Sequence, residues 1–507
     1  MNNLKGKKVL IFQQRRWAMT IGHFLAKKLQ NEGCILAALT AKQSTHDFIL
    51  NQKEVKYEMV VSSDVPKSNP NKFLNGETYD LKRICLELGI DTVWPLVASA
   101  RFHVKSYKDN YYYGYKQNVS DEVIVEYVMA IYKYMLHIFK NFKPDIIVAP
   151  NFATLHHLMF NLYAEKHGIK MIALTDTKIR GLYVFSHGYK NDTGKFYDQI
   201  DALNNNLAIS PNKQLAQKYI SDFRKQFIVP DYCEPTKPKK TLDFLQIFRR
   251  EISPYYQILR WYLHKSENYL EVIGVTPDFR PPKIILRDYY SQKRYKKYAD
   301  NLNYYPLWKI KKYVYFPLQA QPEETIDVLA PFFNNQIEIA RLTAMSLPDD
   351  YTLVVKDHPG MTNKRTPSYL EKISRTPNVK LVDYRLTTEE ILKRADLVIS
   401  PNSTTIAEAA FLSIPSIQFG DLGTTLKLPN NYKHTDMPSL SKKIKEKLQT
   451  NLQNDEYEKK LENYVAAAYD TCIDLNYLKI WQEPGTTEEA SREKLWNFYK
   501  EEIIRLT

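Results

Sequence analysis

Long apolar runs are missing from this chain of 507 residues, and none approaches the roughly 18 residues that a membrane-spanning helix needs. No signal peptide is visible either, because Met1 to Lys8 leads directly into the strand-like run VLIF. Repeats with a period of about 20–50 residues are also absent, which argues against solenoids and propellers. We therefore expect a cytoplasmic protein built from ordinary globular domains.

Cysteine is scarce. The four cysteines, Cys34, Cys85, Cys233 and Cys472, lie far apart, and no CxxC or Cys/His cluster occurs. This spacing argues against a zinc site built from cysteines, and a disulfide framework would be unusual in so long a chain. No DxD run is followed by further metal-ligating residues. We therefore expect reduced thiols, no metal site and no cofactor.

Acidic residues are outnumbered: 57 Asp and Glu stand against 71 Lys and Arg, which gives a net charge of +14. Such an excess indicates an anionic partner, namely nucleic acid, a membrane surface or a phosphorylated substrate. Much of it lies in residues 236–312, with 17 basic residues, 7 acidic residues and ten tyrosines. Because this segment contains no RNA- or DNA-binding motif, we expect no nucleic-acid partner.

Strands and helices are predicted to alternate in the first 204 residues. The predicted strands are 7–14, 34–40, 144–150 and 169–175, and the helices are 20–32, 123–142 and 155–167. Short turns between such elements are typical of a parallel sheet. Residues 1–204 are therefore predicted to form a Rossmann-like domain.

The same alternation returns more regularly over residues 313–436, which are predicted to form the second Rossmann-like domain. The predicted strands are 313–318, 352–356, 379–383, 396–400 and 415–419, and the helices are 335–346, 367–374, 388–394 and 404–412. Between the two domains, 205–312 is predicted to be a basic, tyrosine-rich helical insertion, with an amphipathic helix at 244–263 that is interrupted at Pro254. Residues 437–507 are predicted to be C-terminal helices. The pattern predicts an α/β fold with two Rossmann-like domains that face a cleft.

Ligands of open parallel sheets bind beyond the carboxyl ends of the strands, so the turns after the strands of 313–420 are the candidate chemical sites. The first is Lys356-Asp357-His358-Pro359-Gly360. Pro359 stops the strand from continuing, and His358 can donate a proton or a hydrogen bond to a phosphate oxygen beside the positive charge of Lys356. An ordinary turn with an exposed histidine is the alternative, because an isolated His-Pro pair is a weak motif.

The second candidate turn spans residues 400–409, where a strand ends, hydroxyl groups follow and a helix begins. Its polar residues are Asn402, Ser403, Thr404 and Thr405. A helix N-terminus offers N–H groups and a partial positive charge, so a phosphate can bind there. Glu408 can accept hydrogen bonds from a ribose. The alternative is a capping box between Thr405 and Glu408, which needs no ligand.

A third turn, residues 319–325, follows the first strand of the second domain. Gln319 and Glu323 are predicted to lie in the same crevice as the other two turns. A solvated loop with an acidic helix start is the alternative.

Together, the three turns resemble those of bacterial capsule and surface-polysaccharide glycosyltransferases. The matching segments are YFPLQAQPEET, NNQIEIARLTAMSLP, LVVKDHPG and ADLVISPNSTTIAEAAFLSIPSIQFGD, with a looser match through FKPDIIVAPN in the first domain. The resemblance implies a GT-B fold in which residues 1–204 form the acceptor domain and residues 313–436 bind the nucleotide sugar. It also implies a metal-independent transfer of sugar from a nucleotide donor to a growing capsule or lipopolysaccharide-type glycan.

Related bacterial sialyl- and Kdo-transferases carry a His-Pro turn and a later Ser/Thr turn that contact the cytidine monophosphate of the donor. The resemblance therefore implies that His358, Ser403 and Thr404 face the donor phosphate, and that the loops around them meet in space. The first domain lacks a clear acidic signature of the Kdo-transferases, so CMP-Kdo and a UDP- or GDP-sugar are alternatives. The poly(glycerol phosphate) transferases share a similar pair of turns, but their Asp-Tyr-Ser-Ser run is replaced here by Pro-Asn-Ser-Thr.

A general base for the acceptor hydroxyl is expected at the strand ends of the first domain. Asp176, after a predicted strand, is the first choice, with His156 and His157 as alternatives; a loop or cap role competes for Asp176. A second group of side chains is predicted to bind an anionic acceptor: Arg15, Arg16, Trp17 and His157.

The basic insertion is expected to touch the anionic inner face of the membrane, where lipid-linked acceptors lie, which would make the protein peripheral. The alternative is a helical insertion packed on the protein with solvated charges. Two rival functions fit the same pattern: a non-hydrolysing sugar-nucleotide epimerase, and a non-catalytic polysaccharide assembly protein that retains the transferase fold.

Overall fold

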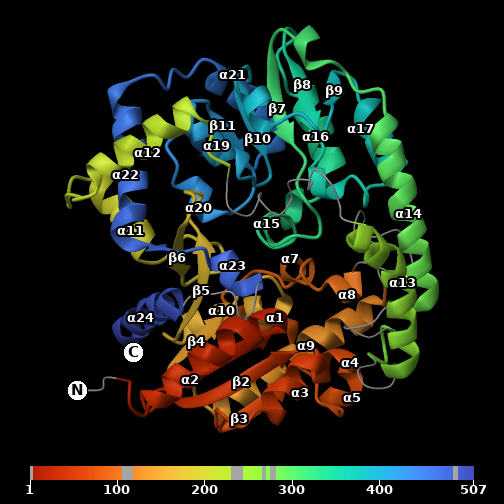
Figure 1. Ribbon diagram of the computed structural model, residues 1–507, viewed down its shortest axis with the longest axis vertical. Helices are drawn as coiled ribbons and strands as arrows, with labels where there is room; N and C mark the ends of the chain where they lie inside the picture. Colours follow the sequence, from red (N-terminus) through yellow and green to blue (C-terminus); the bar gives the residue numbers. More distant parts are fainter. Residues whose placement is uncertain (1–3, 105–117, 230–243, 265–269, 275–280, 483–488) are drawn as a thin grey trace.

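The computed structural model describes residues 4–104, 118–229, 244–264, 270–274, 281–482 and 489–507. Two α/β domains lie one above the other along the long axis of the molecule (Figure 1), and each is built on its own sheet. The predicted α/β fold with two Rossmann-like domains is confirmed.

The first sheet has seven strands in the order β13-β6-β5-β4-β1-β2-β3. Their bounds are β1 Lys8–Gln14, β2 Ile35–Ala41, β3 Met59–Ser62, β4 Ile146–Ala149, β5 Lys170–Asp176, β6 Leu182–Ser186 and β13 Ile473–Asp474. Strands β1 to β5 are parallel, whereas β6 runs antiparallel to β5 and β13 antiparallel to β6. Four of the five parallel strands were predicted; β3 was not.

Both faces of the first sheet are covered, which is why its central strands are apolar throughout. Alternate residues of β1 enter two separate cores: Leu10 and Phe12 pack with α9 (Asp121–Asn141) and α10 (Leu155–Lys166), and Val9 and Ile11 pack on the opposite side. The helices of that opposite core are α2 (His23–Asn31) and α24 (Glu489–Leu506). The other helices before residue 230 are α1 Arg15–Trp17, a π-helical turn Ala18–Gly22, α3 Gln43–Asn51, α4 Asp64–Ser68, α5 Pro70–Leu74, α6 Leu81–Leu88, α7 Trp94–Val97, α8 Arg101–Val104, α11 Lys195–Asn204 and α12 Lys213–Lys225. Of these, α11 and α12 pack with the core of the second domain.

The second sheet has six parallel strands in the order β12-β11-β10-β7-β8-β9. Their bounds are β7 Tyr313–Pro317, β8 Thr352–Lys356, β9 Val379–Val382, β10 Leu397–Ser400, β11 Ser416–Gln418 and β12 Asn431–Lys433. The helices of this half are α15 Glu324–Asp327, α16 Gln336–Met345, α17 Pro367–Ser374, α18 Thr388–Leu392, α19 Thr405–Phe411, α20 Gly423–Leu426 and α21 Leu440–Leu448.

The last part of the chain crosses back to the first domain. Helix α22 (Asp455–Thr471) packs on α11 and α12. Strand β13 then joins the edge of the first sheet beside β6, and α23 (Tyr477–Gln482) and α24 follow on that domain. The C-terminal segment is thus helical apart from this short strand.

Two long helices, α13 (Phe244–His264) and α14 (Pro282–Asn301), form an arm along one side of both domains (Figure 1). The predicted interruption at Pro254 is wrong, because α13 continues through this residue. Proline removes one backbone donor, and here its buried ring lies on the packed side of the helix. None of the described helices combines the length and the apolar character that crossing a bilayer requires.

Candidate functional site

The second sheet changes direction beside its central strand β7. Strands β8 and β9 follow on one side of β7, and β10 returns on its other side. In open α/β sheets, ligands bind at the carboxyl ends of the strands that flank such a switch point. The three predicted turns follow β7, β8 and β10, so the topology places all three at this crevice.

Hydrogen bonds join the three turns into one network. The side-chain amide of Gln319 donates to the Ser403 hydroxyl oxygen over 3.0 Å. Arg365, which is buried, donates to the main-chain carbonyl of Gln319 and forms an ion pair with the buried carboxylate of Asp357, next to His358. The structure therefore brings the loops around His358 and Ser403 together, with Gln319 and Arg365 as the links.

His358 is set up as a neutral hydrogen-bond donor. Its Nδ1 accepts the Gly360 N–H over 3.1 Å, so the ring proton is assigned to Nε2. Burial lowers the pKa of His358 to about 4, and the positive charges of Arg365 and Lys356 act in the same direction. At neutral pH the imidazole therefore offers an N–H group and no charge.

Several predicted donor-binding residues hold the loops in place. Lys356 is buried and donates to the Leu386 carbonyl over 3.0 Å. The side chain of Asn402 donates to the Thr325 carbonyl over 2.6 Å and accepts the Leu422 N–H over 3.2 Å. These contacts tie the β10 turn to the β7 turn. Pro359 is exposed beside His358.

Gly420 leaves room for the side chain of Asn402, which makes the contacts between the two turns. A Cβ atom at Gly420 would lie 2.3 Å from the Asn402 amide nitrogen, so a larger residue at this position would displace the asparagine.

Helix α19 begins differently from the prediction. Thr404 is its N-cap residue without a side-chain cap, and the Thr405 N–H is bound to the Ser403 hydroxyl over 3.1 Å. The alternative of a capping box from Thr405 to Glu408 is wrong, because Thr405 already lies inside the helix. Glu408 is buried, and this raises its pKa to about 7, although the positive charge of Lys356 acts in the opposite direction.

The third turn reaches the first domain. Burial raises the pKa of Glu324 to about 7, while the charges of Arg101 and Lys178, both from the first domain, act to lower it. The carboxylate of the neighbouring Glu323, which is exposed, accepts the Thr325 hydroxyl over 3.1 Å. This turn therefore connects the switch point of the second sheet with the first domain.

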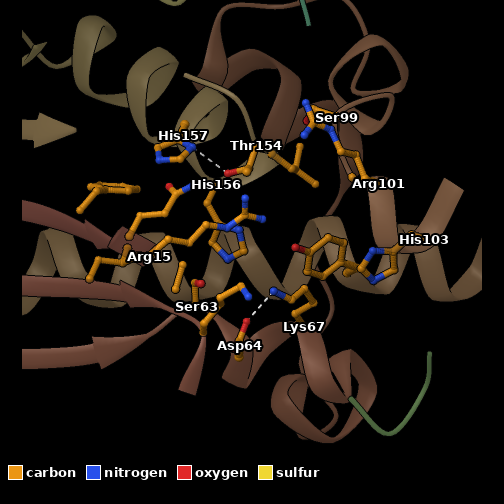
Figure 2. Close-up of a pocket in the computed structure, with 18 residues that line it drawn as sticks. Arg15, Ser63, Asp64, Lys67, Ser99, Arg101, His103, Thr154, His156 and His157 are labelled. Carbon is orange, nitrogen blue, oxygen red and sulfur yellow. Dashed lines mark hydrogen bonds and ion pairs between the residues drawn. The ribbon is translucent and has the colours of Figure 1, made fainter. Parts of the chain in front are cut away.

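The first domain contains an open pocket of about 820 Å³ (Figure 2). It lies where β1 to β4 end, which is the switch point of the first sheet because β2 and β4 flank β1 on opposite sides. Its polar and charged lining residues include Arg15, Lys42, Ser63, Asp64, Lys67, Ser99, Arg101, His103, Thr154, His156 and His157.

Three buried, neutral histidines face this pocket. His103 stacks on Tyr127 with ring centroids 3.9 Å apart, and Nδ1 of His157 lies 2.8 Å from the Thr154 hydroxyl. Burial lowers the pKa of His103 and His157 to about 3 and that of His156 well below its usual value. Within the described part of the chain, both ring nitrogens of His103 and Nε2 of His156 and His157 lack a hydrogen-bond partner. Buried polar atoms are nearly always bonded, so these nitrogens indicate a ligand site.

The pocket is positively charged. Its lining contains four cationic residues, Arg15, Lys42, Lys67 and Arg101, and one carboxylate, Asp64. One oxygen of Asp64 pairs with Lys67 at 2.5 Å, and the other is buried with no bonding partner among the described residues. This surplus of cations favours a ligand that carries negative charge.

Only some of the predicted acceptor residues lie at the pocket. Arg15 and His157 line the pocket, and His156 lies beside them. Arg16 is exposed and does not belong to the pocket lining. Trp17 is fully buried, and its indole N–H donates to the Tyr477 hydroxyl over 2.9 Å. Trp17 therefore belongs to the core and offers no binding surface.

The proposed base Asp176 lies at the end of β5, outside this pocket lining, and pairs with Lys178 at 2.9 Å. Asp64, Lys67, Arg101 and His103 were not among the residues predicted from the sequence. The first two follow β3, a strand that was not predicted. In the described part of the chain, no group of three or more His, Cys, Asp or Glu residues is arranged to hold a metal ion.

No protein-family model matches the chain, and no curated protein is significantly similar to it in sequence. Among solved structures, it is similar to KpsC, a β-Kdo 2,7 transferase of Thermosulfurimonas dismutans, with 14% identity and a TM-score of 0.28 over 67% of this chain and 80% of that one. The glycosyltransferase of calicheamicin, CalG4, matches with 10% identity and a TM-score of 0.28 over 91% and 95%. The UDP-GlcNAc 2-epimerase of Neisseria meningitidis, bound to UDP-GlcNAc, matches with 12% identity and a TM-score of 0.26 over 91% and 97%. Identities and scores this low carry no argument about function.

Proposed function

We propose that this protein is a glycosyltransferase that moves a sugar from a nucleotide-sugar donor to a growing glycan of the capsule or lipopolysaccharide type. The observation that carries the proposal is the hydrogen-bonded network of Gln319, Asp357, Arg365 and Ser403 at the switch point of the second sheet. The donor, of the CMP-Kdo or UDP-sugar type, binds there. The acceptor binds in the pocket of the first domain, and the reaction takes place in the cytoplasm.

Transfer leaves a phosphate whose negative charge grows as the glycosidic bond to the donor breaks. His358 offers its Nε2–H to this phosphate, and the Ser403 hydroxyl lies on the neighbouring turn. Preorganised donors of this kind typically contribute about 3–4 kcal/mol each, a hundredfold or more in rate. Arg365 contributes indirectly. It holds the Asp357 carboxylate, which accepts the His358 N–H, and it donates to the Gln319 main-chain carbonyl.

The acceptor is anionic, since the pocket holds four cations and one carboxylate. Two carboxylates are candidates for the base that takes the proton of the acceptor hydroxyl. Asp176 is paired with Lys178, whereas one oxygen of Asp64 is buried and unbonded among the described residues. Kinetics of Asp64→Asn and Asp176→Asn distinguish the two candidates. Replacing the base is expected to lower kcat while KM stays nearly unchanged.

A thermal-shift screen with CMP-, UDP-, GDP- and CDP-linked sugars tests the donor site, because a ligand that binds the folded state at about 100 times its Kd stabilises it by about 2.7 kcal/mol. We expect one nucleotide class to raise Tm in the parent protein and much less in Ser403→Ala. The donor that binds is then incubated with and without acidic oligosaccharide acceptors. Conversion of the donor alone to its epimer would support the epimerase, and no stabilisation by any nucleotide would support a non-catalytic assembly protein.

A further inference from the structure

The helical arm of α13 and α14 carries an apolar surface that its packing in the fold does not need. Helix α13 rests on α14: Glu251 accepts the hydroxyl of Tyr289 and pairs with Lys293 at 2.5 Å. The side of α13 that contains Glu251, Pro254, Ile258 and Trp261 is buried or half-buried. These residues are spaced by three or four positions, so they lie on one face of the helix.

A second apolar row lies on the exposed side of the same helix. We call it the outer stripe, and it consists of Leu245, Phe248, Ile252, Tyr255, Leu259 and Tyr262. These side chains are also spaced by three or four positions, yet they are 43% to 69% exposed. A surface helix normally turns a single apolar face inward and polar residues outward. An apolar row of this length on the exposed side indicates an interaction surface.

Positive charge borders the outer stripe. Helices α13 and α14 together contain nine Lys and Arg residues and three Asp and Glu residues. Arg249 and Arg260 are exposed and flank the stripe along the same edge of α13. Tyrosine, which suits a boundary between apolar and aqueous surroundings, occurs both within the stripe and beside it at Tyr256, which is 58% exposed.

We propose that the outer stripe of α13 lies in the headgroup region of a lipid bilayer that contains anionic lipids. A helix with an exposed apolar row bordered by basic residues has the pattern of helices that bind in the plane of a membrane. The 21 residues of α13 extend about 30 Å, so the whole row can contact a flat surface at once. The net positive charge of the arm is complementary to anionic headgroups, whereas a second copy of this arm would carry the same charge and repel it.

Vesicle co-sedimentation tests the proposal with the full-length protein. The vesicles are either phosphatidylcholine alone or phosphatidylcholine with 30% phosphatidylglycerol, at low and at high salt. We expect binding to the anionic vesicles at low salt, weaker binding at high salt, and little binding to phosphatidylcholine. Ile252→Asp/Leu259→Asp is expected to reduce partitioning at least tenfold, and Arg249→Glu about fivefold or more, since each basic residue near an anionic surface adds about 1 kcal/mol.

A matched control comes from elsewhere on the surface. Ile209 is 93% exposed and lies outside the arm, so Ile209→Asp removes an exposed apolar side chain and adds one negative charge, half of what the double variant adds, without touching the outer stripe. We expect it to bind vesicles like the parent protein. The thermal transition of each variant shows that it is folded, which is expected because all of these side chains are exposed.

Three outcomes would overturn the proposal. The first is no binding to anionic vesicles at low salt, and the second is equal loss of binding in Ile209→Asp and in Ile252→Asp/Leu259→Asp. The third is a dimer in light scattering that Ile252→Asp/Leu259→Asp converts to a monomer, because the stripe would then be an interface between copies of this chain. The proposal is independent of the sugar-transfer reaction, since none of these measurements uses a donor.

Discussion

Replacing Arg365 with methionine tests the architecture of the proposed donor site most directly. The Arg365 side chain is 1% exposed, as is that of Asp357, and the two form an ion pair. Arg365 also lies over the ring of Tyr369, 4.7 Å from its centroid, and donates to the Gln319 carbonyl. Arg365→Met keeps most of the packing volume but leaves the Asp357 carboxylate buried without its cation.

The expected cost follows from the burial of this pair. Removing one partner of a buried ion pair typically destabilises a protein by about 3–5 kcal/mol. For a domain of roughly 150–250 residues, each kcal/mol shifts Tm by about 2–4 °C, so we expect Tm to fall by about 6–20 °C. Thermal unfolding followed by tryptophan fluorescence measures this change.

Arg375→Met is the matched control, because it makes the same substitution at an exposed arginine. Arg375 follows helix α17, its side chain is 80% exposed, and it pairs with Glu371 at 3.9 Å. Surface pairs contribute little, so we expect a change within about 1 kcal/mol. A fall in Tm of less than about 2 °C in Arg365→Met, or equal falls in the two variants, would refute the reasoning. In addition, Asp357→Asn/Arg365→Met is expected to recover part of the loss, because it removes the uncompensated buried charge.

Three further predictions concern the two binding sites. His358→Ala is expected to lower turnover about a hundredfold or more with Tm within about 2 °C of the parent, and full activity would remove His358 from the reaction. Lys42 lines the pocket of the first domain, and Lys42→Met is expected to raise KM for an acidic acceptor about 10- to 100-fold without changing donor binding. Steady-state kinetics measure this, with Lys53→Met, at an exposed lysine, as the control. Equal effects of the two variants would count against acceptor binding in this pocket. Burial raises the pKa of Glu408 from 4.5 to about 7, so the folded protein keeps a proton that the unfolded chain releases, and stability falls as the pH rises from about 4.5 to 7. Glu408→Gln cannot ionise, and its Tm relative to the parent is expected to increase between pH 5 and pH 8; a constant difference would contradict this.

The regular part of the fold was predictable because its strands are buried on both faces. Strand β8, for example, contains the buried apolar run of residues 353–355, and it was predicted with its observed bounds. The short strands β3, β12 and β13 gave no comparable signal. Strand β3 has four residues, three of them half-buried, and β13 has two, which pair with β6 across a distance of almost 300 residues. Such pairing depends on tertiary structure, which no local sequence pattern indicates.

The proposed donor site was more accessible to prediction than the pocket of the first domain. His358 and Ser403 stand directly after strands that the sequence marks clearly, and topology places such positions at one edge of the sheet. Asp64 follows the unpredicted β3, and His103 lies at the end of a four-residue helix, so neither has a local signature. Trp17 was misassigned because its hydrogen-bond partner, Tyr477, is distant in sequence.

The return of the C-terminus to the first domain has a consequence for synthesis. During translation, β1 to β6 leave the ribosome long before β13 and α24 are made. The face that contains Val9, Ile11 and Ile172 is covered in part by Leu495 and Tyr499 of α24. Until the final helix emerges, this apolar face of the nascent chain is incompletely shielded and accessible to chaperones or to aggregation. Deleting the 18 residues of α24 is therefore expected to lower the yield of folded protein on expression.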